Sequence, residues 1–430
     1  MNTLADRKAR TIDLLRNEPY KIGQFVGFKD LTELHNTWLI DWLYGTKDTT
    51  TQAHRGSYKT SDLALFLALN VVIHPKENTI FLRKTDSDVA EVIRLVARLL
   101  RSGAFNQIAQ TLYGVDLIVL KETMTEIETS LHQGVTRSSE ASQIMGIGLG
   151  GSLTGKHADI VVTDDIVNIK DRVSRAERER TKLMYMELQN IKNRDGRIIN
   201  TGTPWHKDDA FSLMPNIKKY TCYDTGLMTP DEIKHLRSSM SASLFSANYE
   251  LKHIADENAL FTDAQFTSDV DAIYNGIAHI DASYGGEDAT AFTVIHEQGG
   301  LFYVYGKKYT KHVDDCLDDI LALKTKYRAG TTWCERNADK GYLDKTLKAR
   351  GDISSTYHEK MNKHIKISTY LKENWAKVFF LDATDPEYIA EILDYNEHAQ
   401  HDDCPDSLAS AIRQLGKKPM TLNRSIKHGL

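Results

Sequence analysis

Cysteine and proline are both scarce in this sequence. The four cysteines have no C-x-x-C spacing, which excludes the common zinc motifs and a disulfide framework; they are Cys222, Cys316, Cys334 and Cys404. Only 8 prolines occur in 430 residues, which argues against long disordered linkers. We therefore expect a folded protein of a reducing compartment rather than a small, cross-linked secreted one.

Long apolar runs and an excess of positive charge are also missing. No apolar run reaches the length of a membrane-spanning helix, and the polar residues 1–10 do not resemble a signal peptide. Because the formal net charge is −5, any nucleic-acid contact has to come from local basic patches. The hydrophobic content of 41% and the charged content of 26% are typical of a globular protein with two or three domains.

The stretch 54–61 has the surroundings of a phosphate-binding loop. It follows a short polar strand candidate at 48–52 and precedes an apolar helical run at 63–70. In such loops, backbone N–H groups and the N-terminus of the next helix face an anion. Lys59 is expected to reach the β- and γ-phosphates of ATP, and the Thr60 hydroxyl to ligate Mg²⁺. The predicted nucleotide-binding residues of the loop are Arg55, Gly56, Ser57, Lys59, Thr60 and Ser61.

Two residues of this loop differ from the common G-x-x-x-x-G-K-[ST] pattern. Ala53 and Tyr58 stand where glycines are expected, so a surface loop with a chance Lys-Thr pair is the alternative interpretation. Arg55 favours nucleotide binding, because an arginine inside the loop can neutralise charge on the γ-phosphate during hydrolysis. We therefore predict that Arg55 is catalytic as well as nucleotide-binding.

An apolar strand that ends in two acids lies downstream. Residues 158–163 are mostly apolar or β-branched, as in a buried parallel strand, and Asp164 and Asp165 follow them. At the carboxyl edge of a sheet, Asp164 would bind Mg²⁺ and Asp165 would orient or deprotonate the attacking water. A solvated turn is the alternative for this pair alone, but its combination with the loop favours catalysis.

Helices and strands alternate around these motifs, which predicts a doubly wound, mainly parallel sheet. A strand at 79–83 precedes an amphipathic helix at 86–101. A later strand at 197–202 runs into a turn where Thr203 would sense the γ-phosphate. We predict a P-loop ATPase domain at 1–215, which opens with a helical segment, and a helical linker at 216–258.

The last part of the chain, 259–430, has a different order of elements. Three strands come first, and Gly299-Gly300 joins the second to the third in a predicted hairpin. Helices and strands then alternate, and a carboxylate-rich helix comes last, which is the layout of an RNase H-like domain. The predicted strands are 277–283, 290–297, 301–309, 331–335 and 378–381.

Three carboxylates occupy the ends of these elements. Asp281 lies on the first strand, Glu335 ends the fourth and Asp403 opens the last helix, while Asp288 is a possible auxiliary ligand. Carboxylate oxygens suit Mg²⁺ or Mn²⁺, and two such ions can activate water and stabilise the leaving oxygen in phosphodiester cleavage. Any one of these acids alone is more simply a surface residue.

Together the motifs resemble those of the large terminase subunit of tailed bacteriophages, over about residues 35–415. Terminases carry a deviant phosphate loop with an arginine near its start and Lys-Thr at its end, and a strand that ends in two acids. Their coupling segment of Gly-Thr, Pro or Arg, and Trp-His is matched by 202–206. Tyr58, where a glycine is usual, is the departure.

The nuclease half of terminases shows the same correspondence. Their strand Asp, their Glu-x-Asn with a nearby glycine and their His-Asp-Asp are matched by Asp281, by 335–337 with Gly341, and by 401–403. The resemblance favours Asp403 as the third metal ligand over Asp402 and Asp406, the last of which is also placed to cap the helix.

The resemblance implies a motor and nuclease that uses ATP with Mg²⁺, and Mg²⁺ or Mn²⁺ in the nuclease site. It implies that the protein drives double-stranded DNA into an empty capsid and cuts concatemeric DNA. Its expected partners are DNA, the portal protein and the small terminase subunit, in the host cytoplasm and away from membranes. We expect a monomer in solution and a ring on the portal.

Two other classes of protein share parts of this pattern. A helicase-like translocase with a purely structural RNase H-like domain has the same motifs in its first half. A recombinase or resolvase has the nuclease fold but does not explain the ATPase motifs. Metal-dependent nicking of plasmid DNA separates the first alternative from a terminase.

Overall fold

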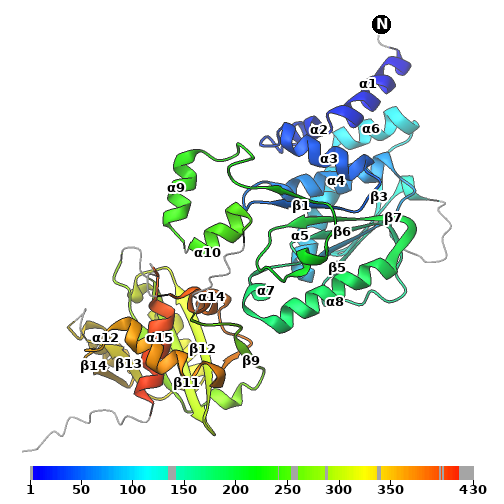
Figure 1. Cartoon of the computed structure of the whole chain (residues 1–430). Coiled ribbons are helices and arrows are strands. Elements are labelled where there is room, and N and C mark those ends of the chain that lie inside the picture. Colours follow the sequence, from blue (N-terminus) through cyan, green and yellow to red (C-terminus); the bar gives the residue numbers. More distant parts are fainter. Residues whose placement is uncertain are drawn as a thin grey trace, which may run out of the picture. The chain divides into compact units, whose positions relative to one another are not determined.

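The computed structural model describes residues 3–133, 142–240, 242–252, 260–285, 289–336, 340–396, 399 and 401–415. The chain separates into two compact units that divide near residue 254, and each unit has its own sheet (Figure 1). Within the described residues, no helix is both long and apolar enough to cross a bilayer.

The first unit is built on an eight-stranded sheet with the order β3-β4-β5-β2-β6-β7-β1-β8. Every neighbouring pair from β5 to β8 is parallel, and only the edge pairs β3–β4 and β4–β5 are antiparallel. This confirms the predicted doubly wound, mainly parallel sheet. The strands are β1 Thr49–Ala53, β2 Thr79–Arg83, β3 Val119–Glu122, β4 Glu126–Thr129, β5 Ile144–Gly148, β6 Ala158–Asp164, β7 Lys192–Gly202 and β8 Ile217–Tyr220.

Side chains alternate between the two faces of this sheet, and each face has its own helices. Phe81 and Val162 pack into the core beneath α3 to α6, whereas Leu82 and Val161 pack toward α8 on the other face (Figure 1). The helices are α1 Leu4–Asn17, α2 Tyr20–Phe25, α3 Glu33–Tyr44, α4 Lys59–Ile73, α5 Asp86–Leu100, α6 Gly103–Tyr113, α7 Ile169–Val173 and α8 Arg175–Ile191. Because α4 is buried on nearly all sides, residues 63–73 of this helix are apolar all round, with the exception of Asn70, rather than amphipathic.

The segment predicted as a helical linker begins with a strand. β8 pairs with β1, so the first sheet continues past residue 215. Helices α9 Pro230–Ser238 and α10 Ala242–Phe245 follow, and then the π-helical turn Ser246–Glu250. Helix α9 starts after Thr229, which caps it reciprocally with Glu232.

The second unit has a seven-stranded sheet with the order β14-β13-β10-β11-β12-β15-β9. The pairs β10–β11 and β11–β12 are antiparallel, and β13 and β14 add in parallel beside β10. This is the arrangement predicted for an RNase H-like domain. The strands are β9 Gln265–Thr267, β10 Ile277–Asp281, β11 Thr290–Gln298, β12 Leu301–Tyr309, β13 Thr332–Glu335, β14 Ser354–Tyr357 and β15 Val378–Leu381.

The helices of the second unit cover both faces of its sheet. Leu317 and Leu343 pack on one face, and the buried side of α15 lies against β10 and β11. The helices are α11 Leu317–Lys326, α12 Tyr342–Ala349, α13 Lys363–Lys366, α14 Pro386–Asp394 and α15 Asp403–Gln414. The short strands β9 and β14 were not predicted, because runs of three or four residues carry little periodicity.

Candidate active sites

The predicted phosphate loop connects β1 to α4 and turns through two left-handed residues. Gly56 has φ +83°, and Tyr58 has φ 58° and ψ 16° immediately before the first helical residue, Lys59. Tyr58 thus adopts the conformation for which a glycine is usual, at a cost in strain. The first N–H groups of α4 have no partner within the helix, so this end of the helix suits an anion.

Contacts from outside the loop fix its shape. The buried His35 of α3 accepts a hydrogen bond from the Thr32 N–H at Nδ1, 2.9 Å away, so its Nε2 donates to the Ser57 carbonyl, also at 2.9 Å. The N–H of Arg55 donates to the Asn248 carbonyl at 2.9 Å. The loop is therefore held from α3 on one side and from the π-helical turn on the other.

The acidic strand ends next to this loop. Strands β1, β7, β6 and β2 run parallel, so their carboxyl ends share one edge of the sheet. The Lys59 ammonium lies 3.7 Å from Asp165 Oδ1, and the Thr60 hydroxyl donates to Asp164 Oδ2 at 3.2 Å. The four residues expected to handle phosphate, Mg²⁺ and water therefore meet at one point.

Arg83 also belongs to this site, and the sequence analysis missed it. It is the last residue of β2, and its guanidinium lies 3.1 Å from Asp164 and 3.6 Å from Asp165. Desolvation and the neighbouring Asp165 raise the pKa of Asp164, whereas Arg83 and Lys59 oppose that rise. In the sequence, Arg83 is only a cation at the end of an apolar strand. Its role can be recognised only when β2 is known to lie beside β6.

The other predicted residues of this site lie nearby but make different contacts. Thr203 is buried, and its hydroxyl donates to the Ala53 carbonyl at 3.2 Å, at the end of β1. Arg55 is exposed, and its side chain forms no hydrogen bond or ion pair with the residues that the structure describes. The hydroxyl of Ser57 is buried without a hydrogen-bond partner among these residues, and Ser61 is partly buried.

The carboxylates of the second unit gather at one edge of its sheet. Asp281 ends β10 and Glu335 ends β13, one residue beyond the paired Ile280 and Cys334 of these parallel strands. Desolvation raises the pKa of Asp281 well above its usual range, and the charges of Asp406 and Asp403 raise it further. Asp288 and Asn337 lie outside the described residues.

Helix α15 supplies two more carboxylates to this cluster. Asp403 accepts a hydrogen bond from the Ala289 N–H at 2.9 Å. After desolvation, the Asp406 charge is the largest influence that raises the pKa of both Asp281 and Glu335. Asp281, Glu335, Asp403 and Asp406 are called the acidic cluster below. Asp406 was considered from the sequence only as a weaker candidate than Asp403.

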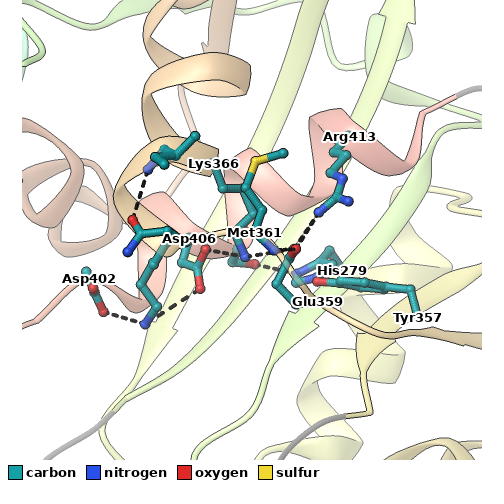
Figure 2. Close-up of polar contacts among 12 residues, drawn as sticks. His279, Tyr357, Glu359, Met361, Lys366, Asp402, Asp406 and Arg413 are labelled. Carbon is teal, nitrogen blue, oxygen red and sulfur yellow. Dashed lines mark hydrogen bonds and ion pairs between the residues drawn. The ribbon is translucent and has the colours of Figure 1, made fainter.

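Two lysines of α13 project toward the acidic cluster. The Lys366 ammonium lies 2.6 Å from Asp406 Oδ1, and the Lys363 ammonium lies 2.7 Å from Asp402 and 3.6 Å from Asp406 (Figure 2). Desolvation lowers the pKa of Lys363, but the charges of Asp406 and Asp402 outweigh it and raise that pKa. These lysines were not predicted, because nothing in their sequence marks them.

The acidic cluster fits divalent cations by its chemistry. Its carboxylates raise one another's pKa although two lysines lie beside Asp406, and hard oxygen donors suit Mg²⁺ or Mn²⁺. Among the described residues, however, no three acids, histidines or cysteines are already arranged around a common metal position. Metal binding therefore requires local movement of these side chains.

Comparisons with known proteins gave matches only at the level of structure. No family model matches the sequence, and no curated protein matches it. The large terminase of the thermophilic bacteriophage D6E in complex with ADP has a TM-score of 0.38 and 12% identity, with 89% of this chain and 98% of that chain covered. The HK97 bacteriophage large terminase has a TM-score of 0.36 and 11% identity, with coverages of 84% and 88%.

A third match covers a smaller part of this chain. The large terminase nuclease of thermophilic phage G20c with bound magnesium has a TM-score of 0.27 and 18% identity, with 35% of this chain and 85% of that chain covered. All of these identities are low, so the matches concern the fold. Over most of its length, the chain is similar to solved bacteriophage large terminases.

Proposed function

We propose that this protein is the large terminase subunit of a bacteriophage, with an ATPase in its first unit and a metal-dependent nuclease in its second. The observation that best supports the proposal is the meeting of Lys59 and Thr60 with Asp164 and Asp165 at one edge of a parallel sheet. ATP hydrolysis would drive double-stranded DNA into a capsid, and the nuclease would cut concatemeric DNA.

In the ATPase, each side chain has a distinct proposed role. Lys59 neutralises charge on the β- and γ-phosphates, and Thr60 and Asp164 would bind Mg²⁺, which when bound draws charge from the phosphate oxygens. Asp165 orients the attacking water or accepts its proton. Arg83 holds both carboxylates in place, since its guanidinium contacts Asp164 and Asp165.

We propose that Arg55 is an arginine finger, a side chain that neutralises charge on the γ-phosphate during hydrolysis. Its backbone N–H donates to Asn248, while its side chain is exposed and forms no hydrogen bond or ion pair with other described residues, so it is available to a nucleotide. Thr203 connects the end of β7 to the end of β1 and would carry a change in the phosphate site into the sheet.

In the nuclease, the acidic cluster would hold Mg²⁺ or Mn²⁺. These ions, when bound, lower the pKa of water and stabilise charge on the oxygens of a phosphodiester. The residues that would hold them are Asp281 and Glu335 at the strand ends and Asp403 and Asp406 of α15. We further propose DNA, the portal protein and the small terminase subunit as partners. The protein would be a monomer in the host cytoplasm and would form a ring when it assembles on the portal.

The proposal is tested by two activities of the full chain. We expect DNA-stimulated ATP hydrolysis that Lys59→Ala abolishes, because the cation opposite the phosphates is lost. We also expect nicking of supercoiled plasmid that depends on Mg²⁺ or Mn²⁺ and stops on addition of EDTA. Absence of ATP hydrolysis in the wild-type protein, with or without DNA, would refute the motor.

A helicase-like translocase with a structural second domain is the competing function. It is favoured by the contacts of Lys363 and Lys366, which already occupy carboxylates of the acidic cluster. A purified protein that hydrolyses ATP but never nicks plasmid, at any Mn²⁺ concentration, would favour this translocase.

A further inference from the structure

Lys366 is the most deeply buried cation near the acidic cluster. Its side chain is 1% exposed, although it lies on the short helix α13 and carries a charge. Burying an ammonium is costly unless it is paired, so the contacts of Lys366 matter for the stability of this region. Its ammonium lies 2.6 Å from Asp406 Oδ1 and 3.4 Å from Glu359 Oε2.

Glu359 is the second carboxylate that contacts Lys366. The Arg413 guanidinium donates to both oxygens of Glu359 at 2.6 Å, and the N–H of Met361 donates to it at 2.7 Å (Figure 2). Glu359 is therefore engaged on several sides, and it cannot follow Lys366 if the lysine moves. Asp406, in contrast, has only the cations Lys366 and Lys363 as ion-pair partners among the described residues.

The position of Asp406 shows what Lys366 does there. Asp406 lies on the buried side of α15, which packs against β10, the strand that ends in Asp281. Lys366 contacts Asp406 through Oδ1. A divalent ion held by these carboxylates would need the Asp406 oxygen that Lys366 now contacts.

Resting on the proposed nuclease, we propose that Lys366 is a resident cation of the acidic cluster. It holds Asp406 in the metal-free protein and competes with the divalent ion for that carboxylate. Lys366 therefore weakens metal binding and keeps the cluster from being fully loaded at low metal concentration. Removal of its charge tightens divalent binding instead of loosening it.

The test is Mn²⁺ binding to the full chain, measured by calorimetry without DNA or nucleotide. We expect Lys366→Met to bind Mn²⁺ at least tenfold more tightly than the wild-type protein, and Lys366→Arg, which keeps the charge, to bind like wild type. Lys366→Gln provides a neutral but polar variant in case the methionine variant does not fold. Lys324→Met is the matched control, because Lys324 is also a buried lysine of this unit but pairs with Asp352.

Stability gives a second readout. Against EDTA, Mn²⁺ should raise the melting temperature of Lys366→Met more than that of the wild-type protein, whereas Lys324→Met should show the wild-type increase. Unchanged or weaker Mn²⁺ binding in both Lys366→Met and Lys366→Gln would overturn the proposal. Adding Asp281→Asn to the wild-type protein and to each variant shows whether Mn²⁺ binds at the acidic cluster, because binding there should then be lost. If no variant has binding that Asp281→Asn removes, the proposed nuclease site itself fails.

Discussion

Tyr58 and Asp165 both have left-handed backbones, with φ of 58° and 46°, at the candidate ATPase site. Such conformations cost about 1–2 kcal/mol in residues other than glycine and persist only where the surroundings enforce them. Asp165 is enforced by its N–H, which donates to the Thr201 carbonyl at 3.1 Å. Tyr58 is enforced by the ends of the loop, which α3 and the π-helical turn hold.

The strain at Tyr58 leads to a prediction with a matched pair of variants. Tyr58→Gly should unfold at the same or a slightly higher urea concentration than wild type, because the relieved strain offsets the extra flexibility of the unfolded chain. Tyr58→Val should be about 1–2 kcal/mol less stable than Tyr58→Gly, because a β-branched residue resists this conformation. Equal stability of the two variants would show that the loop can do without the left-handed turn.

Arg55 and Arg83 should matter more for ATP hydrolysis than for ATP binding, unlike Lys59. Both Arg55→Ala and Arg83→Met should lower kcat for ATP hydrolysis at least tenfold, while the Kd of a fluorescent ATP analogue changes about threefold or less. The reason is that an arginine that neutralises the γ-phosphate, and one that holds the catalytic carboxylates, act mainly on the transition state. Arg94→Met, which alters an exposed arginine of α5, is the control. A parallel loss of binding in Arg83→Met would assign Arg83 to nucleotide affinity.

Asp403 and Asp406 are the two carboxylates that α15 adds to the acidic cluster, and each can be tested by substitution. Both Asp403→Asn and Asp406→Asn should abolish Mn²⁺-dependent plasmid nicking, because each carboxylate faces Asp281. Asp402→Asn should reduce nicking only a few-fold, since the main described contact of Asp402 is with Lys363. Near wild-type nicking by Asp406→Asn would remove it from the proposed ligands and leave Asp403, as the resemblance favours.

At the scale of elements, each site depends on a helix that is fixed by buried hydrogen bonds. In the second unit, Ser407 of α15 contacts His279 of β10 at 2.9 Å and Thr293 of β11 at 2.8 Å. These contacts set the rotation of α15 and thereby direct Asp403 and Asp406 toward the strand ends. In the first unit, His35 of α3 has the same function for the phosphate loop.

The pKa of His35 makes the α3 contact sensitive to pH. Burial lowers this pKa below its usual value of 6.5, so the stability that neutral His35 gives is present above pH 6.5 and is lost as pH falls below it. His54 has a pKa lowered mainly by burial and contributes with the same sign. Each of these two histidines can change the free energy of unfolding by at most about 1.4 kcal/mol per pH unit.

We therefore expect the first unit to be less stable toward urea at pH 5.5 than at pH 7.5. The difference between the two pH values should be smaller in His35→Gln than in wild type, because this titrating group is gone. Lys8→Gln, an exposed change on α1, should keep the wild-type difference. An unchanged difference in His35→Gln would mean that His35 does not titrate in this range.

At the scale of the whole molecule, the two units have separate cores and carry separate sites. The core around Trp42 and Phe66 belongs to the first unit, and the core around Phe292 and Leu317 belongs to the second. The motifs predicted to hydrolyse ATP lie before residue 254, and the acidic cluster lies after it.

Two ligands should accordingly stabilise two different thermal transitions of the full chain. MgADP should raise one transition and Mn²⁺ the other, because a ligand at about 100 times its Kd adds about 2.7 kcal/mol to the unit that binds it. Asp281→Asn should remove only the Mn²⁺ shift, and Lys59→Ala only the MgADP shift. A single transition that both ligands raise together would contradict independent units.

The sequence by itself determined the strands and helices that carry the main motifs. Lys59, Thr60, Asp164 and Asp165 were predicted from the combination of a deviant phosphate loop with an acidic strand end, and the structure brings them together. The two fold classes followed in the same way, from the order of apolar runs and turns. β9 and β14 escaped prediction because they are short and acquire their strand character from their neighbours.

Only the tertiary structure decided which distant residues share a site. Arg83 lies about eighty residues before the acids that it contacts, and no local pattern encodes the adjacency of β2 and β6. Likewise, the pairing of Lys366 with Asp406 depends on how α13 packs near α15. Such contacts result from the burial of whole elements, which depends on the packing of the entire chain, so the sequence near either residue does not contain them.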